Sequence, residues 1–260
     1  MHIKTLIFIC FHVSTLLLAQ GIKLDANKNN RKLLEACNYL EADVLYEEGR
    51  GERISFCKID GQRYEIVGKI SSRERLISGT SVLTILGGTI EGNKIIISDE
   101  TEVLVDNSKV KVAATYTGSF TAVAIRVIAS DASTSSTADE ISDNIFGTSG
   151  DTFNMKSQFS ACSYDQFTMD AFSGTTSSGQ TITNGVGVVT INSDIIGADK
   201  YAVHDLVEAA ADAKYGVLRN QVDFVLLCLP HGTITPVKNT DTWIGYGYYD
   251  SYLTVYNDEW

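Results

Sequence analysis

The sequence predicts a mixed α and β fold (α+β or α/β) in two units, a β-rich unit over residues 39–117 and an α/β unit over residues 118–260. In the first unit, short runs of β-branched residues alternate with turns, as in a small all-β domain. In the second unit, apolar strand-like runs alternate with helical patterns, which is typical of a mostly parallel sheet. Only 2 prolines stand beside 21 glycines, and many Thr, Val and Ile residues favour strands over helices.

The first nineteen residues have the pattern of a secretory signal peptide. Lys4 is followed by an almost wholly apolar run from Thr5 to Ala19, shorter than the about 20 residues that a membrane-spanning helix needs. An uncleaved anchor stays open as an alternative, because Leu17 is large for its place two residues before the predicted cut. Residues 20–38 are polar and indicate a flexible leader, so the mature chain is expected to be secreted, extracellular and free of the membrane.

Composition restricts the partners of this chain. With 44% hydrophobic residues, 260 residues are enough for a sizeable core. The formal net charge of -11 argues against a nucleic-acid partner, because binding of phosphates requires a clustered basic surface.

The β-rich unit is expected to contain a hairpin. Arg53–Ile59 alternates in polarity, Asp60-Gly61 is a strong turn signal, and Gln62–Val67 follows it. Further strands are predicted at residues 82–86, 94–97 and 102–105. No group of residues in this unit indicates chemistry.

The second unit opens with a strand over residues 120–129, apolar enough to be covered on both faces. Thr137 begins a short helix that Gly147 ends, and a second short helix precedes Cys162. The remaining strands are predicted at residues 166–172, 187–191, 222–229, 243–248 and 252–256.

The longest helix is predicted over residues 202–218. Its expected apolar face is formed by residues at helical spacing. These are Val203, Leu206, Val207, Ala210 and Val217.

Four cysteines remain after the predicted signal, an even number that suits an oxidising compartment. They are Cys37, Cys57, Cys162 and Cys228. Three pairings exist, and Cys37 with Cys57 and Cys162 with Cys228 is favoured because each pair then falls inside one unit. A thiol metal site lacks the usual zinc spacing.

Common catalytic motifs are absent from the sequence. It contains no Gly-x-Ser-x-Gly, no phosphate loop and no His-Glu-x-x-His. His204 and His231 are the histidines beyond the signal. His204 is expected to be exposed or to cap a helix, and His231 to lie in a turn. A His204–Asp205 acid–base pair stays open without support.

Several segments resemble, in the same order, the gametolysin family of secreted zinc metallopeptidases of the metzincin clan. The similarity covers most of the mature chain, and the ordered set is more specific than any one segment. The segments are Ala42–Arg53, Val123–Val127, Met155–Ser163, Phe224–Pro230, Trp243–Tyr252 and Val255–Trp260.

The resemblance implies a β-rich propeptide over residues 39–117, followed by the upper half of a metzincin-like catalytic domain with a mixed sheet. In the family, the zinc helix with His-Glu-x-x-His follows the region that matches Val255–Trp260. No zinc ligand or catalytic glutamate has a counterpart here, so we expect no cofactor and no peptidase activity in these residues alone. The chain is then a truncated gene model, a pseudogene product or an inactive paralogue, and one face of its sheet is expected to be exposed.

Metzincins bind extended peptides along an edge strand, which implies that Ile244, Gly245 and Tyr246 line the rim of the substrate cleft. The alternative is that these aromatic strands only pack the sheet. Extracellular or cell-wall proteins are the expected substrates or ligands. A non-catalytic secreted binding or inhibitory module is the alternative function, and an unrelated hydrolase that uses His204 or His231 is a third.

Overall fold

The computed structural model describes residues 36–70, 76–107, 117–235, 242–248 and 251–258. The predicted signal peptide and most of the predicted leader lie outside these residues. The N-terminal strands are β1 (Cys37–Tyr46), β2 (Gly51–Ile59), β3 (Gln62–Val67), β4 (Val82–Leu86), β5 (Thr89–Glu91), β6 (Lys94–Ile96) and β7 (Glu102–Asp106). The following elements are β8 (Gly118–Ile128), α1 (Ala138–Phe146), α2 (Met155–Cys162), β9 (Phe167–Ala171), β10 (Gly174–Thr175), β11 (Thr181–Ile182), β12 (Val186–Thr190), α3 (Lys200–Tyr215), the 3-10 helix η2 (Leu218–Asn220), β13 (Phe224–Leu229), β14 (Trp243–Tyr248) and β15 (Leu253–Asn257).

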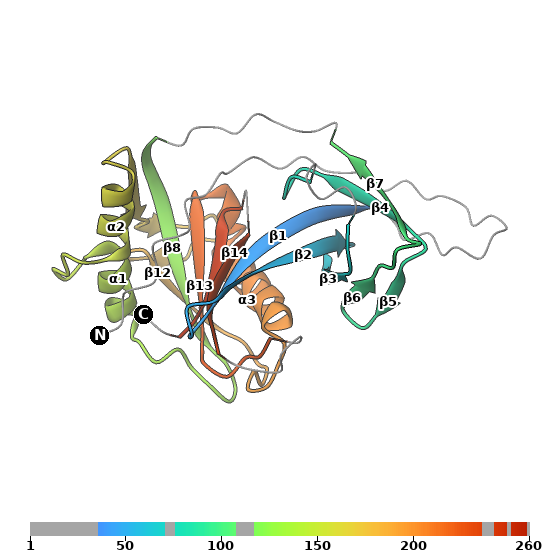
Figure 1. Cartoon of the computed structure of the whole chain (residues 1–260). Helices are drawn as coiled ribbons and strands as arrows, with labels where there is room; N and C mark the ends of the chain where they lie inside the picture. Colours follow the sequence, from blue (N-terminus) through green and yellow to red (C-terminus); the bar gives the residue numbers. More distant parts are fainter. Residues whose placement is uncertain (1–35, 71–75, 108–116, 236–241, 249–250, 259–260) are drawn as a thin grey trace.

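A 13-stranded mixed sheet runs through the molecule in the order β12-β8-β13-β15-β14-β1-β2-β3-β6-β5 (Figure 1). Strands β12, β8, β13 and β15 are mutually parallel, and β14 is antiparallel to β15. Strands β4 and β7 branch from β1, and β9 pairs with β8. The structure therefore confirms an α+β fold with a large mixed sheet.

The two predicted units meet through β1 and β14. These strands pair antiparallel, with Ala42 opposite Tyr248 and Val44 opposite Tyr246. On its other side β1 pairs with β2, so the long β1–β2 hairpin extends from the central sheet to the remaining N-terminal strands (Figure 1). The N-terminal strands thus continue the sheet of the second unit.

Helices cover both faces of the central sheet. In β8, Val123 and Ile125 face the core beneath α3, whereas Ala122 and Ala124 face the core beneath α1 and α2. None of the described residues of β8, β13, β14 or β15 is an exposed large hydrophobic residue. The expectation of an exposed sheet face is therefore wrong for the described residues, because α3 and the α1–α2 pair close opposite faces.

Capping interactions set the ends of the helices. Thr137 and Glu140 form a capping box at the start of α1, and Gly147 ends the helix with φ 71°, as predicted. Asp199 accepts a hydrogen bond from the Tyr201 N–H and begins α3 two residues before the predicted start. None of the helices in the described ranges is long and apolar enough to cross a membrane.

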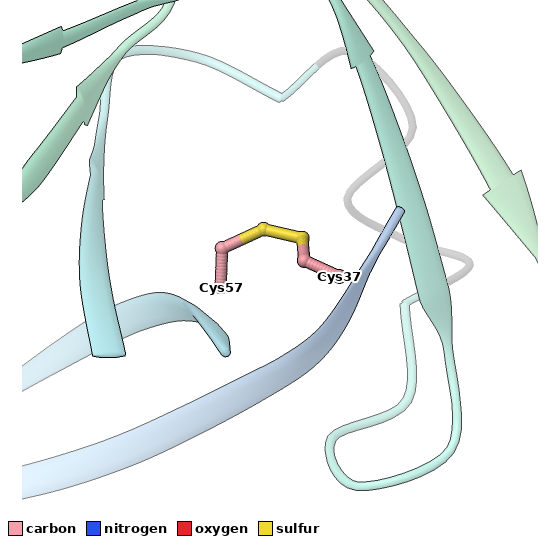
Figure 2. The surroundings of a disulfide bond; sticks show 2 residues. All are labelled: Cys37 and Cys57. Carbon is pink, nitrogen blue, oxygen red and sulfur yellow. A yellow bond between two sulfur atoms is a disulfide. The ribbon is translucent and has the colours of Figure 1, made fainter. Parts of the chain in front are cut away.

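The disulfide Cys37–Cys57 joins β1 and β2 inside a third core, formed by the N-terminal strands (Figure 2). This confirms one of the two predicted pairs. The pairing of Cys162 with Cys228 is wrong, because both cysteines are free. Cys228 faces the buried core beneath α1 and α2, whereas Cys162 is exposed at the end of α2, so being in the same unit does not bring the two sulfur atoms together.

Candidate functional site

A partly buried polar cluster lies where β3 faces the start of α3. We call Arg63, His204, Asp205 and Glu208 the Arg63 cluster. The last three residues are neighbours on the first turns of α3, since residues one turn apart lie on the same side of a helix. Arg63 reaches them from β3, just after the Asp60-Gly61 turn. The side chains of Arg63 and His204 are 5% and 0% exposed, whereas those of Asp205 and Glu208 are 41% and 27% exposed.

The guanidinium of Arg63 contacts all three helix residues. Its Nη2 lies 2.6 Å from Asp205 Oδ1 and 3.6 Å from Glu208 Oε2. Its Nη1 lies 2.9 Å from His204 Nδ1. One cation from the N-terminal strands therefore joins two carboxylates and an imidazole of the second unit.

Three tyrosines surround the Arg63 cluster. Tyr248 Oη accepts a hydrogen bond from Arg63 Nη1 at 2.7 Å, and Tyr246 Oη lies 2.9 Å from His204 Nδ1. Tyr252 Oη donates to Glu208 Oε1 at 2.6 Å. Residues of β14 and the segment before β15 thereby hold the side chains of α3 in place.

Burial, followed by the positive charge of Arg63, lowers the pKa of His204 from 6.5 to about 4. Burial alone raises the pKa of Glu208, but its contacts with His204 and Tyr252 and the charge of Arg63 outweigh that and lower it. At neutral pH the imidazole is therefore neutral and the Glu208 carboxylate is ionised.

Both ring nitrogens of His204 lie within hydrogen-bond distance of the Arg63 guanidinium. Arg63 Nη1 lies 2.9 Å from Nδ1, and Arg63 Nη2 lies 3.2 Å from Nε2. A neutral imidazole has a single acceptor nitrogen, so it accepts from one of these two donors, and Nε2 also faces Glu208 Oε2 at 3.6 Å.

The donor atoms of His204, Asp205 and Glu208 all lie within 4.8 Å of one another, close enough to share a metal ion. An imidazole nitrogen and two carboxylate oxygens are ligands that zinc accepts. In this conformation, however, Arg63 Nη2 lies among them and supplies the positive charge. The arrangement is therefore an internal ion-pair cluster that connects the two units.

The predicted cleft-rim residues lie in β14, which has a strand on each side. Tyr246 and Gly245 are buried, and Ile244 is half-buried. The Tyr246 ring packs 5.5 Å from the Trp243 ring and 5.2 Å from the Tyr201 ring, between ring centroids. The structure thus places Tyr246 in the aromatic core beneath α3.

The two histidines fall in different environments. The expectation that His204 is exposed or caps the helix is wrong, because its ring is buried and Asp199 is the cap. His231 is exposed in a turn. Sequence reasoning missed Arg63 and Glu208. The spacing of His204 and Glu208, four residues apart on a helix, was the available signal.

No family model, no curated protein and no solved structure matches this chain.

Proposed function

We propose that the chain is a secreted, gametolysin-like peptidase precursor. Its N-terminal strands act as a propeptide, residues 118–260 supply the upper half of a metzincin-like catalytic domain, and the 260 residues alone do not hydrolyse peptide bonds. The similar segments named above and the predicted order of elements support this assignment. The observation that carries it is the pairing of β1 with β14.

Strand β14 is the antiparallel strand beside the parallel strands β15 and β13. The resemblance to metzincins implies an edge strand beside the zinc, at Ile244–Tyr246 in this sequence, that binds an extended peptide through main-chain hydrogen bonds. Here β1 pairs with β14 from Ala42 to Tyr46 and so takes the place that such a peptide would fill. A propeptide that masks the substrate-binding strand accounts for this pairing.

The residues present do not fit the family's zinc site. Zinc peptidases need a metal that acidifies its water and a carboxylate that takes the proton. The sequence has no His-Glu-x-x-His, and His204 and His231 lie on different elements. For this reason the proposal assigns no hydrolytic step to the described residues.

Secretion is part of the proposal. The pattern of residues 1–19 supports it, and the Cys37–Cys57 disulfide suits the oxidising compartments through which exported proteins pass. Mass spectrometry of the protein recovered from the medium of expressing cells is expected to find an N-terminus at about residue 20, since cleavage follows the small residue at the end of such signals. Retention of the full N-terminus in a membrane fraction would contradict secretion.

The proposal that these 260 residues have no peptidase activity by themselves is tested with the purified protein. Incubation with casein and zinc is expected to release no peptides above the level of a heat-denatured control. Cleavage that zinc supports and a chelator abolishes would overturn the proposal.

A second candidate is a non-catalytic secreted binding or inhibitory module. The burial of both faces of the central sheet favours it, because the described residues leave no large apolar sheet face exposed. A monodisperse monomer with one cooperative melting transition, together with no peptidase activity, would support the module. Association into aggregates would count against it.

A further inference from the structure

We propose that His204, Asp205 and Glu208 form a binding site for a divalent transition-metal ion and that the Arg63 guanidinium and the metal ion occupy this site in turn. The site is distinct from the zinc helix of the peptidase family and does not depend on the function proposed above. The guanidinium seated among the three donors is the observation that identifies the site as one for cations.

The spacing of the donors suits a shared metal ion. Two ligands that each lie about 2.1 Å from a tetrahedral zinc ion are roughly 3.4 Å apart. His204 Nε2 and Glu208 Oε2 are 3.6 Å apart, and Asp205 completes a set within 4.8 Å. Arg63 Nη2 lies 2.6 Å from Asp205 and 3.2 Å from His204 Nε2, at the place where a metal ion would contact the same atoms.

The charge of the site also suits a divalent ion. With Arg63 withdrawn, two carboxylates and a neutral imidazole remain, and a divalent cation balances them. The two carboxylates are only partly buried, with side chains 41% (Asp205) and 27% (Glu208) exposed, and a neighbouring cation, either the guanidinium or the metal ion, stabilises their charge.

Hydroxyl groups already hold the outer side of two donors. Tyr252 Oη donates to Glu208 Oε1, which leaves Oε2 facing the site. Tyr246 Oη lies against His204 Nδ1, so Nε2 faces the site as well. Metal ligands are commonly oriented by such outer contacts. A neutral imidazole that binds a metal through Nε2 carries its proton on Nδ1, which can then donate to the Tyr246 hydroxyl.

Mutual exclusion has a reciprocal consequence. If Arg63 weakens metal binding, a bound metal weakens the attachment of Arg63, and hence of β3, by the same factor. Binding of a metal ion would then weaken the contact between β3 and α3.

The experiment compares zinc binding by the intact chain and by Arg63→Gln, measured by isothermal titration calorimetry. Arg63→Gln removes the competing charge and is expected to bind one zinc ion at least tenfold more tightly than the unaltered chain. The double variant R63Q/H204A lacks the imidazole and is expected to lose that gain. Arg53→Gln is the matched control, because Arg53 is an exposed arginine of the neighbouring strand.

Zinc affinity that is the same in R63Q and the unaltered chain, or that persists in R63Q/H204A, would overturn the proposal. Should R63Q fail to fold, Arg63→Met keeps the apolar stem and takes its place with the same expected results. Hydrogen exchange of the intact chain at saturating zinc adds a second readout. Faster exchange of the β3 amides is expected, and slower exchange there would contradict mutual exclusion.

Discussion

The two faces of the central sheet are covered in different ways. The face beneath α1 and α2 is closed by residues of the second unit alone, and its core is built from aliphatic and aromatic side chains such as Ile141, Ile145 and Leu226. The face beneath α3 is closed jointly with the N-terminal strands, which contribute Val44 and Phe56. Next to this second core lie the Arg63 cluster, in which Arg63 and His204 are buried and the two carboxylates are partly exposed, and the buried side chain of Lys200.

The two faces therefore differ in how many side-chain combinations they tolerate. An apolar core accepts many combinations of side chains of suitable size, whereas a buried charge requires a partner of opposite charge or a hydrogen-bonding group next to it. Lys200 has the same character, since its Nζ lies 4.7 Å from the ring centroids of Trp243 and Tyr246. Of these groups, Arg63 crosses from the N-terminal strands to α3, so the Arg63 cluster lies where the two units meet.

The largest expected effect comes from opening the shared core. Phe56 is 1% exposed, and its ring lies 4.9 Å from that of Tyr201 on α3, between centroids. Phe56→Ala is expected to lower the free energy of unfolding by about 3–5 kcal/mol and to speed hydrogen exchange in α3 and β14. The matched control is Ile95→Ala, since Ile95 lies in the separate N-terminal core. Faster exchange of α3 in both variants would contradict the distinction between shared and separate cores.

The separate N-terminal core has its own covalent link. Replacing Cys37 and Cys57 together by alanine removes a disulfide with a sequence separation of 20. The expected loss is about 3 kcal/mol in the free energy of unfolding, measured by urea denaturation, because the unfolded chain gains freedom. Cys162→Ala is the control and is expected to leave stability unchanged. Equal stability of the double variant and the intact chain would show that the link contributes little.

The buried imidazole makes the shared face sensitive to pH. The pKa of His204 is about 4 in the folded chain and 6.5 when unperturbed, so between these values the unfolded chain binds the additional proton. The free energy of unfolding should therefore fall as pH decreases from 6.5, with a slope of up to about 1.4 kcal/mol per pH unit. The lowered pKa of Glu208 adds its own loss only below its ordinary value of 4.5.

The diagnostic window thus lies between pH 6.5 and 4.5, with a chelator present. Urea denaturation at several pH values measures the slope. His204→Gln is expected to remove most of the slope in this window. An unchanged slope would assign the effect to other groups.

The smallest effect concerns reactivity rather than stability. Cys162 is exposed, whereas Cys228 is buried in the core beneath α1 and α2, and burial raises the pKa of its thiol. A thiol reagent is expected to label Cys162 rapidly in the folded protein and Cys228 only after unfolding. Protection of Cys162 in the folded protein would contradict its assignment as a free, exposed thiol.

Local patterns predicted most of the individual elements. The turn between β2 and β3 could be predicted because Asp and Gly tolerate the positive φ that such turns require. In the structure φ is 48° at Asp60 and 86° at Gly61. The Thr137 cap and Gly147 end of α1 were readable for similar reasons. Each of these signals acts within a few residues of its own position.

Two features were beyond such patterns. Strand β1 was not predicted as an element, and its pairing with β14 joins distant parts of the chain. On α3, the sequence predicted that Leu206 is buried, but it is 47% exposed and His204 is buried instead. Compared with the predicted orientation, α3 is rotated so that His204 faces the aromatic core and Arg63. The spacing of apolar residues along a helix cannot predict a polar partner on another strand.

The position of β1 has a consequence for how the protein folds during synthesis. Its partner β14 is made long after β1, so the Ala42–Tyr46 part of β1 lacks its intramolecular partner on this edge until then. An unpaired strand edge is a site for mispairing with other chains. The strand that joins the two units is therefore open to mispairing while the chain is being made, and dependence on chaperones is expected to increase with the time between synthesis of β1 and of β14.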